Sequence, residues 1–383
     1  MKLIYLDNNA TTRVLPQVME AMLPWFSEQY GNPSSSHPLG QYAKQAALTA
    51  RKAVASFLHA SLAEIVFTSG ATESIQTAIL GALAARPERR KIVTSTVEHA
   101  STLLLLNQLA ETEGIEVLLV PVNSGGQLDM AALAAAVTPD TALVTLLHAN
   151  NETGVIFPVA EAAAIARAQG ALFHIDAAQS AGKISLDVAN LGCDMLSFSG
   201  HKLHAPKGVG VLYVRKGIAL QPLILGHQER NRRGGTENLT GIVGLDIACH
   251  LAQQSLTSER TTIASLRDRL EQGILSRLPF ARVNGNGLRI PNTTNICLPD
   301  LPGDEVLLRL GQAGVMASQG SACTASGTEP SHVLLAMGLN RDNAFSSLRF
   351  SLSRETTEAE IDSVIDTIAA IAKHILPEVL EAA

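Results

Sequence analysis

The sequence predicts an α/β fold, with a large domain built on a mostly parallel seven-stranded sheet flanked by helices and a smaller α+β domain. Between residues 64 and 214, short β-branched runs alternate with Ala- and Leu-rich stretches of helical period. This alternation is typical of parallel sheets covered by helices. After about residue 251 the pattern changes to helices separated by short strands. The length of 383 residues also exceeds what one hydrophobic core usually serves.

Seven segments between residues 64 and 214 have the length and composition of strands. They are 65–68, 91–95, 117–122, 142–147, 172–175, 195–199 and 209–214. Helices are expected between them, for example at 72–85 and 159–168, and Gly170 suits the end of the second. Upstream, residues 41–59 have the pattern of one long helix, preceded by a turn-rich segment at 31–38.

The C-terminal part has a different order of elements. The expected elements are a helix at 258–277, short strands at 281–284 and 294–298, a helix at 304–311, a Gly/Ser/Thr loop at 318–328, a strand at 347–351 and a final helix from Thr357. We therefore expect a large domain over residues 15–254 and a small domain over residues 255–383, which the N-terminal arm of residues 1–14 joins.

Composition and charge exclude several classes of protein. The chain is 46% hydrophobic and 17% charged, which is ordinary for folded globular proteins. The formal net charge of -6, with no basic run beyond Arg230, Arg232 and Arg233, argues against direct binding of nucleic acid. The first twelve residues are too polar for a signal peptide, and no apolar stretch is long enough to span a membrane. We expect a soluble, cytoplasmic protein that does not bind membranes.

The four cysteines are Cys193, Cys249, Cys297 and Cys323. They lie far apart, have no C-x-x-C spacing for zinc and are too few for a disulfide scaffold in a chain of this length. We therefore expect no metal site, and any special cysteine should be reactive rather than structural. The first three lie in apolar segments and are interpreted as small core residues.

Polar residues follow several of the predicted strands, at the sheet edge where α/β proteins bind their ligands. The segment from Thr68 to Glu73 is a glycine turn that leads into a helix, whose N-terminus could hold a phosphate or could simply be capped. Asp176 and Gln179 follow the strand at 172–175. An anionic Asp176 could keep a ring nitrogen protonated, or it could cap the next helix.

Lys202 follows the strand at 195–199, beside Ser199 and His201. A lysine that forms a Schiff base needs a partly desolvated amine, and a strand end beside polar groups provides such a place. An isolated lysine is usually only a solvated charge. The series of polar groups at neighbouring strand ends favours the functional interpretation.

The order of seven motifs resembles that of the Nif/Isc-type cysteine desulfurases, pyridoxal-phosphate enzymes of fold type I in the class V aminotransferase family. The motifs are SGATE, EHAS, HANNETG, HIDAAQS, SFSGHKLHAPKGVG, RRGGTEN and SQGSACT. The resemblance extends from the segment YLDNNATT at residues 5–12 to Arg349, almost the whole chain. It implies that the protein takes sulfur from L-cysteine, releases L-alanine and holds the sulfur as a persulfide on Cys323. The small residues around Cys323 would let its thiol visit both the cofactor and an acceptor.

The resemblance implies pyridoxal 5'-phosphate as the cofactor and gives roles to the residues around it. The expected catalytic residues are Lys202, which would hold the cofactor as a Schiff base, Cys323, and the proton carrier His99. The expected cofactor-binding residues are Ala71, Thr72, His99, Asn151, Asp176, Gln179, Ser199, His201, Lys202 and Thr236. Within this set Asp176 would pair with the ring nitrogen, Gln179 with the phenolic oxygen, and His99 would stack over the ring.

The resemblance also implies a homodimer, with Thr236 reaching the phosphate of the partner subunit and the other phosphate ligands coming from the same chain. The substrate carboxylate would be held by Asn151 and by Arg349, whose guanidinium suits two-point binding of a carboxylate. The expected partners are L-cysteine and a sulfur acceptor, such as an iron–sulfur scaffold protein. Nitrogenase maturation and tRNA or DNA thiolation stay open as destinations of the sulfur.

The sequence departs from the family pattern at a few positions. Ile75 and Gln76 stand where many relatives carry asparagine, Gln319 where serine is usual and Phe345 where histidine is frequent. None of these changes removes a group from the chemistry above. Selenocysteine stays open as a substrate. The Cys323 loop disfavours an aminotransferase, and the complete set of cofactor-binding groups disfavours a catalytically silent scaffold.

Overall fold

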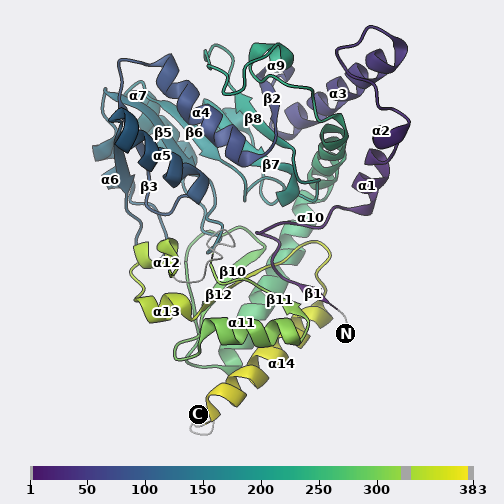
Figure 1. Cartoon of the computed structure of the whole chain (residues 1–383). Helices are drawn as coiled ribbons and strands as arrows, with labels where there is room; N and C mark the ends of the chain where they lie inside the picture. The colour runs from purple at the N-terminus through teal and green to yellow at the C-terminus, as the bar shows by residue number, and fades with distance from the viewer. Residues whose placement is uncertain (1–2, 321–328, 378–383) are drawn as a thin grey trace.

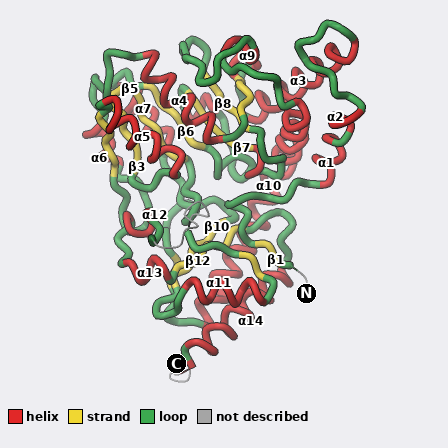
Figure 2. Tube along the Cα trace, viewed as in Figure 1, coloured by secondary structure: helices red, strands yellow, loops and turns green. Residues whose placement is uncertain are grey.

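The computed structural model describes residues 3–320 and 329–377 and confirms the predicted α/β fold. Figure 1 shows a large sheet with helices on both faces in the upper part, and a smaller group of strands and helices below it. In the tube view of Figure 2, the strands of the large sheet lie between helices in the same way.

The large sheet contains the seven strands that the sequence predicts, each within two residues of its expected bounds. In spatial order they are β2 (Ile65–Thr68), β8 (Gly210–Val214), β7 (Met195–Ser199), β6 (Leu172–Asp176), β5 (Thr141–Leu147), β3 (Lys91–Ser95) and β4 (Glu116–Val120). Only β8 runs in the opposite direction to the other strands. The other six strands therefore end at the same edge, and the loops that follow them lie close together.

Both faces of this sheet are buried, which explains its nearly continuous apolar strands. One face packs on α4 (Ala71–Ala85) and α5 (Ala100–Glu113), through residues such as Ile79 and Leu106. The other packs on α3 (Pro38–Phe57) and α7 (Val159–Ala168), among others. Shorter elements complete this part: α1 (Pro16–Met22), α2 (Pro24–Ser27), η1 (Leu62–Glu64), α6 (Met130–Ala136), α8 (Val188–Leu191), η2 (Gly200–Lys202) and α9 (Gln228–Asn231).

The long helix α3 begins three residues before its predicted start. His37 caps it by accepting a hydrogen bond from the Gly40 N–H, and Pro38 occupies the first turn. A proline suits that place because its fixed φ is helical and the N–H it lacks would have no partner within the helix. Pro38 therefore belongs to the start of α3 and not to the turn-rich segment at 31–38, in which the sequence pattern placed it.

Helix α10 (Leu239–Arg277) is much longer than the predicted helix at 258–277. It begins after Asn238, whose side chain accepts from the Gly241 N–H. Gly241 and Gly244 weaken the helical signal at its start, but Gly244 lies where a Cβ would come within 2.7 Å of the Met22 sulfur, so close packing requires it. The helix runs from the large sheet into the lower part (Figure 1). The predicted boundary at residues 254/255 falls inside it, and the division into two domains stays a prediction.

The lower part has its own hydrophobic core, which includes Leu6, Ile274, Phe350 and Ile365. Its sheets are an antiparallel one, ordered β12 (Ser347–Ser351), β10 (Thr293–Cys297) and β9 (Arg282–Val283), and a parallel pair of β1 (Ile4–Tyr5) and β11 (Val315–Met316). Its helices are α11 (Gly303–Gln312), α12 (His332–Ala336), α13 (Arg341–Phe345) and α14 (Glu358–Ile375). Because β1 pairs with β11, the N-terminal arm belongs to this core.

Within the described ranges, 3–320 and 329–377, no helix is both long enough and apolar enough to cross a membrane.

His174 lies at the centre of the large sheet and is fully buried. Its ring joins three strands, because Nδ1 lies 2.8 Å from Thr145 Oγ1 on β5 and Nε2 lies 2.8 Å from Ser197 Oγ on β7. Burial lowers the pKa of His174 to about 3. The ring is therefore neutral in the folded protein around pH 7.

The low pKa of His174 predicts acid sensitivity. The unfolded chain binds a proton on this histidine below pH ~6.5, whereas the folded protein does not. Stability should therefore fall as the pH drops from about 6.5 towards 3, by up to about 1.4 kcal/mol per pH unit from this group. In His174→Gln the decline measured by urea unfolding should be shallower. The exposed His374→Gln variant is the control, and equal slopes for wild type and His174→Gln would contradict the prediction.

Candidate active site

A cavity of about 490 Å³ lies at the edge where the parallel strands end. Its volume is in the range of sites that bind small molecules and cofactors. The residues that line it come from the N-terminal arm and from the loops after β2, β3, β5, β6 and β7. They are Ala10, Thr11, Ser69, Gly70, Ala71, Thr72, Glu73, Ile75, His99, Ser101, Leu147, Ala149, Asn151, Asp176, Ala178, Gln179, Ser199, His201, Lys202, Lys207 and Gly208.

Lys202 lies in this cavity, in the single turn η2 that directly follows β7. Its Nζ donates to two backbone carbonyls of the N-terminal arm, Asn9 O at 2.5 Å and Ala10 O at 2.9 Å. The side chain is only partly exposed. The arm thus holds the amine at the wall of the cavity, a placement that suits a lysine used as a nucleophile.

The start of α4 forms a second wall of the cavity. Ala71 and Thr72 occupy its first turn, whose N–H groups have no acceptors within the helix, and Ser199 and His201 lie across from them. At Gly210 a Cβ would come within 2.5 Å of Gly70 Cα, so β8 approaches this turn as closely as only glycine allows. Backbone donors and hydroxyls at a helix N-terminus form a binding site for a phosphate group.

The end of β6 places Asp176 and Gln179 at the floor of the cavity, each 6% exposed. Burial raises the pKa of Asp176, while the Ala178 N–H and the neighbouring His99 and Lys202 oppose the rise. Gln179 Nε2 donates to Asn9 O at 3.0 Å, and its Oε1 accepts from Lys183 Nζ at 2.7 Å. A buried carboxylate of this kind is stabilised by a cationic partner.

His99 lines the same cavity and caps α5, with its Nδ1 accepting from the Ser101 N–H at 3.1 Å. The ring proton is therefore on Nε2. Burial lowers the pKa of His99, and the nearby Lys202 and His332 lower it further, against the opposing effect of Asp176. The preceding Glu98 is fully buried, and burial raises its pKa to about 8. The two residues lie in the turn between β3 and α5.

The two predicted substrate-binding residues occupy different places. Asn151 lines the cavity, whereas Arg349 lies behind it on β12 and is only 1% exposed. Arg349 Nη1 donates to Asn151 O at 3.1 Å and Nη2 to Asp7 Oδ1 at 2.7 Å. Its Nε is buried and has no hydrogen-bond partner among the described residues. The guanidinium therefore has one N–H donor, at Nε, that no described residue accepts.

Thr236 does not line this cavity. It lies in a neighbouring hollow with Glu229 and Arg233, and Ser69 and Gly208 line both spaces. Glu229 to Asn231 have left-handed backbone, with φ of 48° at Glu229, which is rare outside glycine. Arg51 holds this run through two hydrogen bonds to the Glu229 carboxylate, at 2.6 and 2.8 Å. A buried ion pair therefore fixes the backbone just before Thr236.

The predicted sulfur carrier Cys323 lies outside the described residues. The other cysteines, Cys193, Cys249 and Cys297, are buried. Burial raises the pKa of each, to about 12 for Cys193. None of these three thiols is suited to be a nucleophile, because the thiolate is the reactive form. Among the described residues, no group of three or more His, Cys, Asp or Glu side chains could hold a metal ion.

Asn9 is a site residue that the sequence analysis did not identify. Its backbone carbonyl accepts from Lys202 and Gln179. Its side-chain Oδ1 accepts from Lys183 at 2.9 Å and Asn292 at 3.1 Å, and its Nδ2 donates to Asn151 O and Thr293 Oγ1. The only local signal was an Asn-Asn pair in a short segment, which is also typical of an exposed turn.

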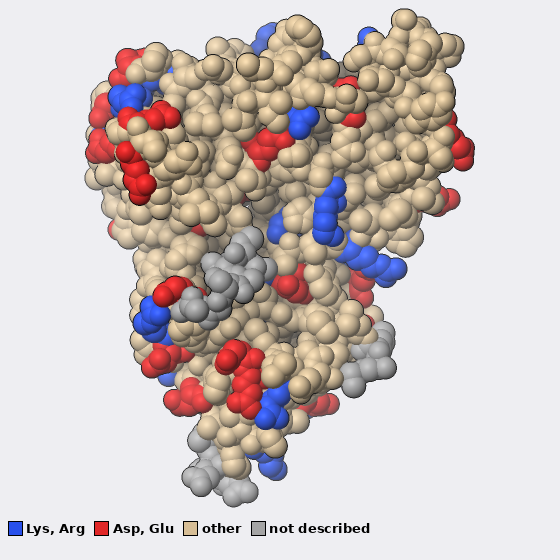
Figure 3. Space-filling model, in the orientation of Figure 1, with Lys and Arg blue, Asp and Glu red and all other residues tan. Residues whose placement is uncertain are grey.

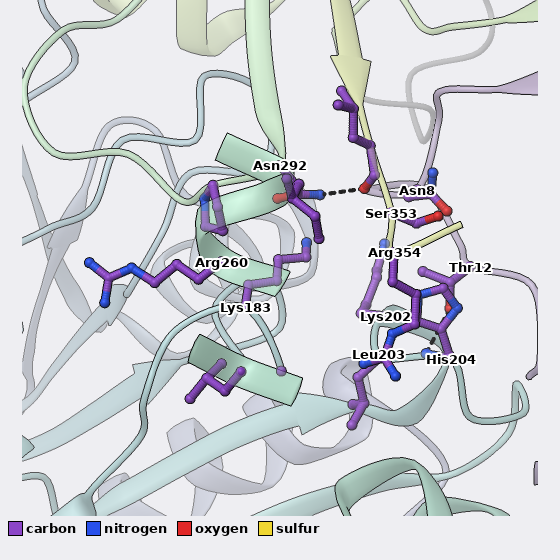
Figure 4. Close-up of a pocket in the computed structure, with 15 residues that line it drawn as sticks. Asn8, Thr12, Lys183, Lys202, Leu203, His204, Arg260, Asn292, Ser353 and Arg354 are labelled. Atoms are coloured by element: carbon purple, nitrogen blue, oxygen red, sulfur yellow. Dashed lines mark hydrogen bonds between the residues drawn. The ribbon is translucent and has the colours of Figure 1, made fainter. Parts of the chain in front are cut away.

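A second, much smaller cavity of about 40 Å³ lies behind the first, and Lys202 lines both. Figure 4 shows Lys183 and Lys202 reaching it from different elements, with Asn292 hydrogen-bonded to the Leu352 carbonyl beside them. Burial, together with Lys202 and Arg349, lowers the pKa of Lys183 well below its usual value. Lys183 thus supports Gln179 from the side away from the larger cavity.

Proteins with similar sequences identify the family to which a chain with this cavity belongs. Residues 4–364 match the aminotransferase class V family. The chain is 50% identical to the cysteine desulfurase of a Nostoc species over 383 residues, all of this chain and 94% of the relative. It is 49% identical to the cysteine desulfurase NifS of Azotobacter vinelandii, over 97% of this chain and 93% of the relative.

Solved structures give the same result. A NifS-like protein superposes with a TM-score of 0.92 at 37% identity, over 97% of this chain and all of the other. The protein SspA, solved in complex with cysteine, superposes with a TM-score of 0.81 at 37% identity, over 91% and 98% of the two chains. By matches that span almost its whole length, the chain belongs to the cysteine desulfurases of the aminotransferase class V family.

Proposed function

We propose that this cysteine desulfurase uses pyridoxal 5'-phosphate to remove sulfur from L-cysteine, releasing L-alanine and leaving a persulfide on Cys323. The observation that carries the proposal is the position of Lys202. Its amine lies at the end of β7 in a cavity that also contains a buried carboxylate, a histidine and a helix N-terminus. Such a set of groups is what a Schiff-base lysine and its cofactor need.

The residues of the cavity fit this cofactor group by group. Lys202 would hold its aldehyde carbon, Asp176 its ring nitrogen and Gln179 its phenolic oxygen. The phosphate would lie at the start of α4, between Ala71, Thr72, Ser199 and His201. When bound, the cofactor supplies an acceptor for the electrons that the substrate's Cα–H bond releases. The buried Asp176 carboxylate gains a cationic partner in this arrangement, because it holds a proton at the ring nitrogen.

Lys202 and His99 are the proposed proton carriers. The carbonyls of Asn9 and Ala10 orient the Lys202 amine, which takes the proton from the substrate's Cα. His99 is held by Ser101 with its proton on Nε2, so that this atom can donate to the substrate. Because its pKa is lowered, the ring is neutral around pH 7 and adds no positive charge beside Lys202.

Sulfur transfer is assigned to Cys323. Its thiolate attacks the sulfur of the bound L-cysteine, and a sulfur–sulfur bond forms as the Cβ–S bond breaks. The electron pair of the broken bond goes to the carbon, which takes up a proton and leaves as part of alanine. The persulfide on Cys323 then carries the sulfur to an acceptor.

The proposal also includes an oligomeric state and a sulfur acceptor. We infer a homodimer in which Thr236 reaches the phosphate site of the partner subunit, since in its own chain Thr236 lies in a separate hollow. Large exposed apolar side chains, among them Phe26, Tyr30 and Leu225, are of the kind that a second copy would cover. We propose a sulfur-acceptor protein, such as an iron–sulfur scaffold, as the further partner, and the cytoplasm as the place of action.

We propose that the protein does not bind nucleic acid directly. The formal net charge is -6. On the face shown in Figure 3, acidic and basic side chains are interspersed rather than gathered into a basic surface. A basic patch is the usual mark of nucleic-acid binding.

The first prediction from this mechanism concerns Lys202. In Lys202→Ala, alanine formation should fall at least about a hundredfold, because the base that moves the Cα proton is lost. The variant should also lose the visible absorption of the lysine-bound cofactor while keeping the wild-type far-UV spectrum. The exposed Lys373→Ala variant should behave as wild type. An unchanged absorption band in Lys202→Ala would refute the assignment.

The second prediction concerns Arg349. Replacement by lysine leaves a point charge that cannot bind a carboxylate at two points. We expect kcat/KM for L-cysteine to fall about 10- to 100-fold, as for the loss of one charged hydrogen bond. Steady-state kinetics beside the exposed Arg341→Lys variant measures this effect. Equal losses in both variants, or none in Arg349→Lys, would count against a substrate-binding role.

The third prediction separates sulfur capture from the earlier steps. Cys323→Ser should still bind cofactor and L-cysteine, as followed by absorption spectra, but should not accumulate alanine, because a hydroxyl is far less ionised than a thiol. Mass spectrometry of wild type after brief exposure to L-cysteine should find one added sulfur on the peptide with Cys323. Added sulfur on Cys193, Cys249 or Cys297, or full turnover by Cys323→Ser, would overturn the mechanism.

A further inference from the structure

The contact between Asp7 and Arg349 joins the N-terminal arm to the proposed carboxylate site. Arg349 Nη2 donates to Asp7 Oδ1 at 2.7 Å, and the side chains of Arg349 and Asp7 are 2% and 19% exposed, respectively. The backbone of Asp7 is fixed, because Asp7 bridges to Ser351 on β12 and its carbonyl accepts from the Tyr5 hydroxyl at 3.1 Å. The carboxylate is therefore held at the guanidinium by both segments.

Asp7 is also the group that balances the charge of Arg349. The other acidic residue near this guanidinium, Glu152, is buried, and burial raises its pKa despite the hydrogen bond from Ser331. On the remaining side Arg349 meets a neutral acceptor, the Asn151 carbonyl. Lys183 lies near enough for its pKa to be lowered by Arg349. Asp7 is therefore the carboxylate that directly contacts this buried cation.

We propose that Asp7 is the resting counter-ion of Arg349, and that a substrate carboxylate has to displace it or share the guanidinium with it. This inference rests on the proposed role of Arg349 in binding the carboxylate. Two carboxylates on one guanidinium repel each other, so Asp7 weakens the binding of any anion there. A simple anion gains too little to overcome this cost. An amino acid gains more, because its amine and side chain make further bonds in the cavity.

Asp7 is thereby a specificity-determining residue. It keeps the arginine from capturing small carboxylates, and it keeps a buried charge paired when no substrate is present, which avoids the large cost of an unpaired buried ion. Arg349 Nε is buried and has no partner among the described residues, so the guanidinium has one N–H donor beyond those that bind Asp7 and Asn151.

The test uses the full-length protein and the variant Asp7→Asn, which keeps the size of the side chain and one acceptor oxygen but removes the charge. Propionate is the probe, because it carries the carboxylate and lacks the amine. We expect calorimetry to show about tenfold tighter binding of propionate to Asp7→Asn than to wild type, of the order of one charged hydrogen bond. The KM for L-cysteine should fall in parallel, with no rise in kcat.

The matched control is Asp366→Asn, which breaks an aspartate–arginine pair with Arg277 on the surface. It should leave propionate binding and KM unchanged. If Asp7→Asn does not fold, Asp7→Glu serves instead. It retains the charge, so propionate binding should stay within about twofold of wild type, and tenfold tighter binding would overturn the proposal.

The outcomes separate this inference from the proposed function. Weaker substrate use by Arg349→Lys together with unchanged propionate binding by Asp7→Asn would overturn the role of Asp7 and leave Arg349 as the carboxylate site. No effect in either variant would overturn both. A fall in kcat with unchanged propionate binding would show that Asp7 has only a structural role.

Discussion

The site depends on the hydrogen bonds of one residue, Asn9. Its carbonyl oxygen accepts from the proposed Schiff-base lysine and from Gln179, while its side chain joins Lys183, Asn151, Asn292 and Thr293. These partners come from the large sheet and from the lower part of the molecule. Asn9 is 1% exposed, so each of these polar groups would lose one hydrogen bond if the arm moved away. The N-terminal arm is therefore part of the framework that holds the side chains of the cavity in place.

The acidic side chains around the cavity also have positively charged or basic neighbours. Asp176 is buried near His99 and Lys202, and Arg349 is buried against Asp7. Each carboxylate thus has a positive group close by before any ligand arrives. His99 and His201 have lowered pKa values, so neither ring adds a positive charge to the cofactor site around pH 7. A charged ligand therefore enters a site in which the charged side chains and the helix N-terminus are already in position.

The parts that could be predicted from sequence are those governed by local patterns. All seven strands of the large sheet were predicted, because buried parallel strands are continuous β-branched runs. The grouping of Ala71, Asp176 and Lys202 in one cavity followed from the rule that parallel strands end at one edge. Strands β1 and β11, with two residues each, are too short to leave a pattern, and the glycines near Gly244 hid the start of α10. The place of Arg349 behind Asn151 and the role of Asn9 depend on contacts between segments about 140 or more residues apart, which no local pattern reveals.

Helix α10 connects a hydrophobic core under the large sheet with the core of the lower part as one continuous element. Its first turns carry Ile242 and Leu245 into the core under the large sheet, and its last turns carry Leu270 and Ile274 into the core of the lower part. At 1.5 Å per residue its 39 residues extend about 58 Å. Both cores pack on this one helix. If either core unfolds, the helix loses part of the packing that holds it in place, and this destabilises the other core. The large sheet and the lower part should therefore melt as one cooperative unit, although their cores are separate.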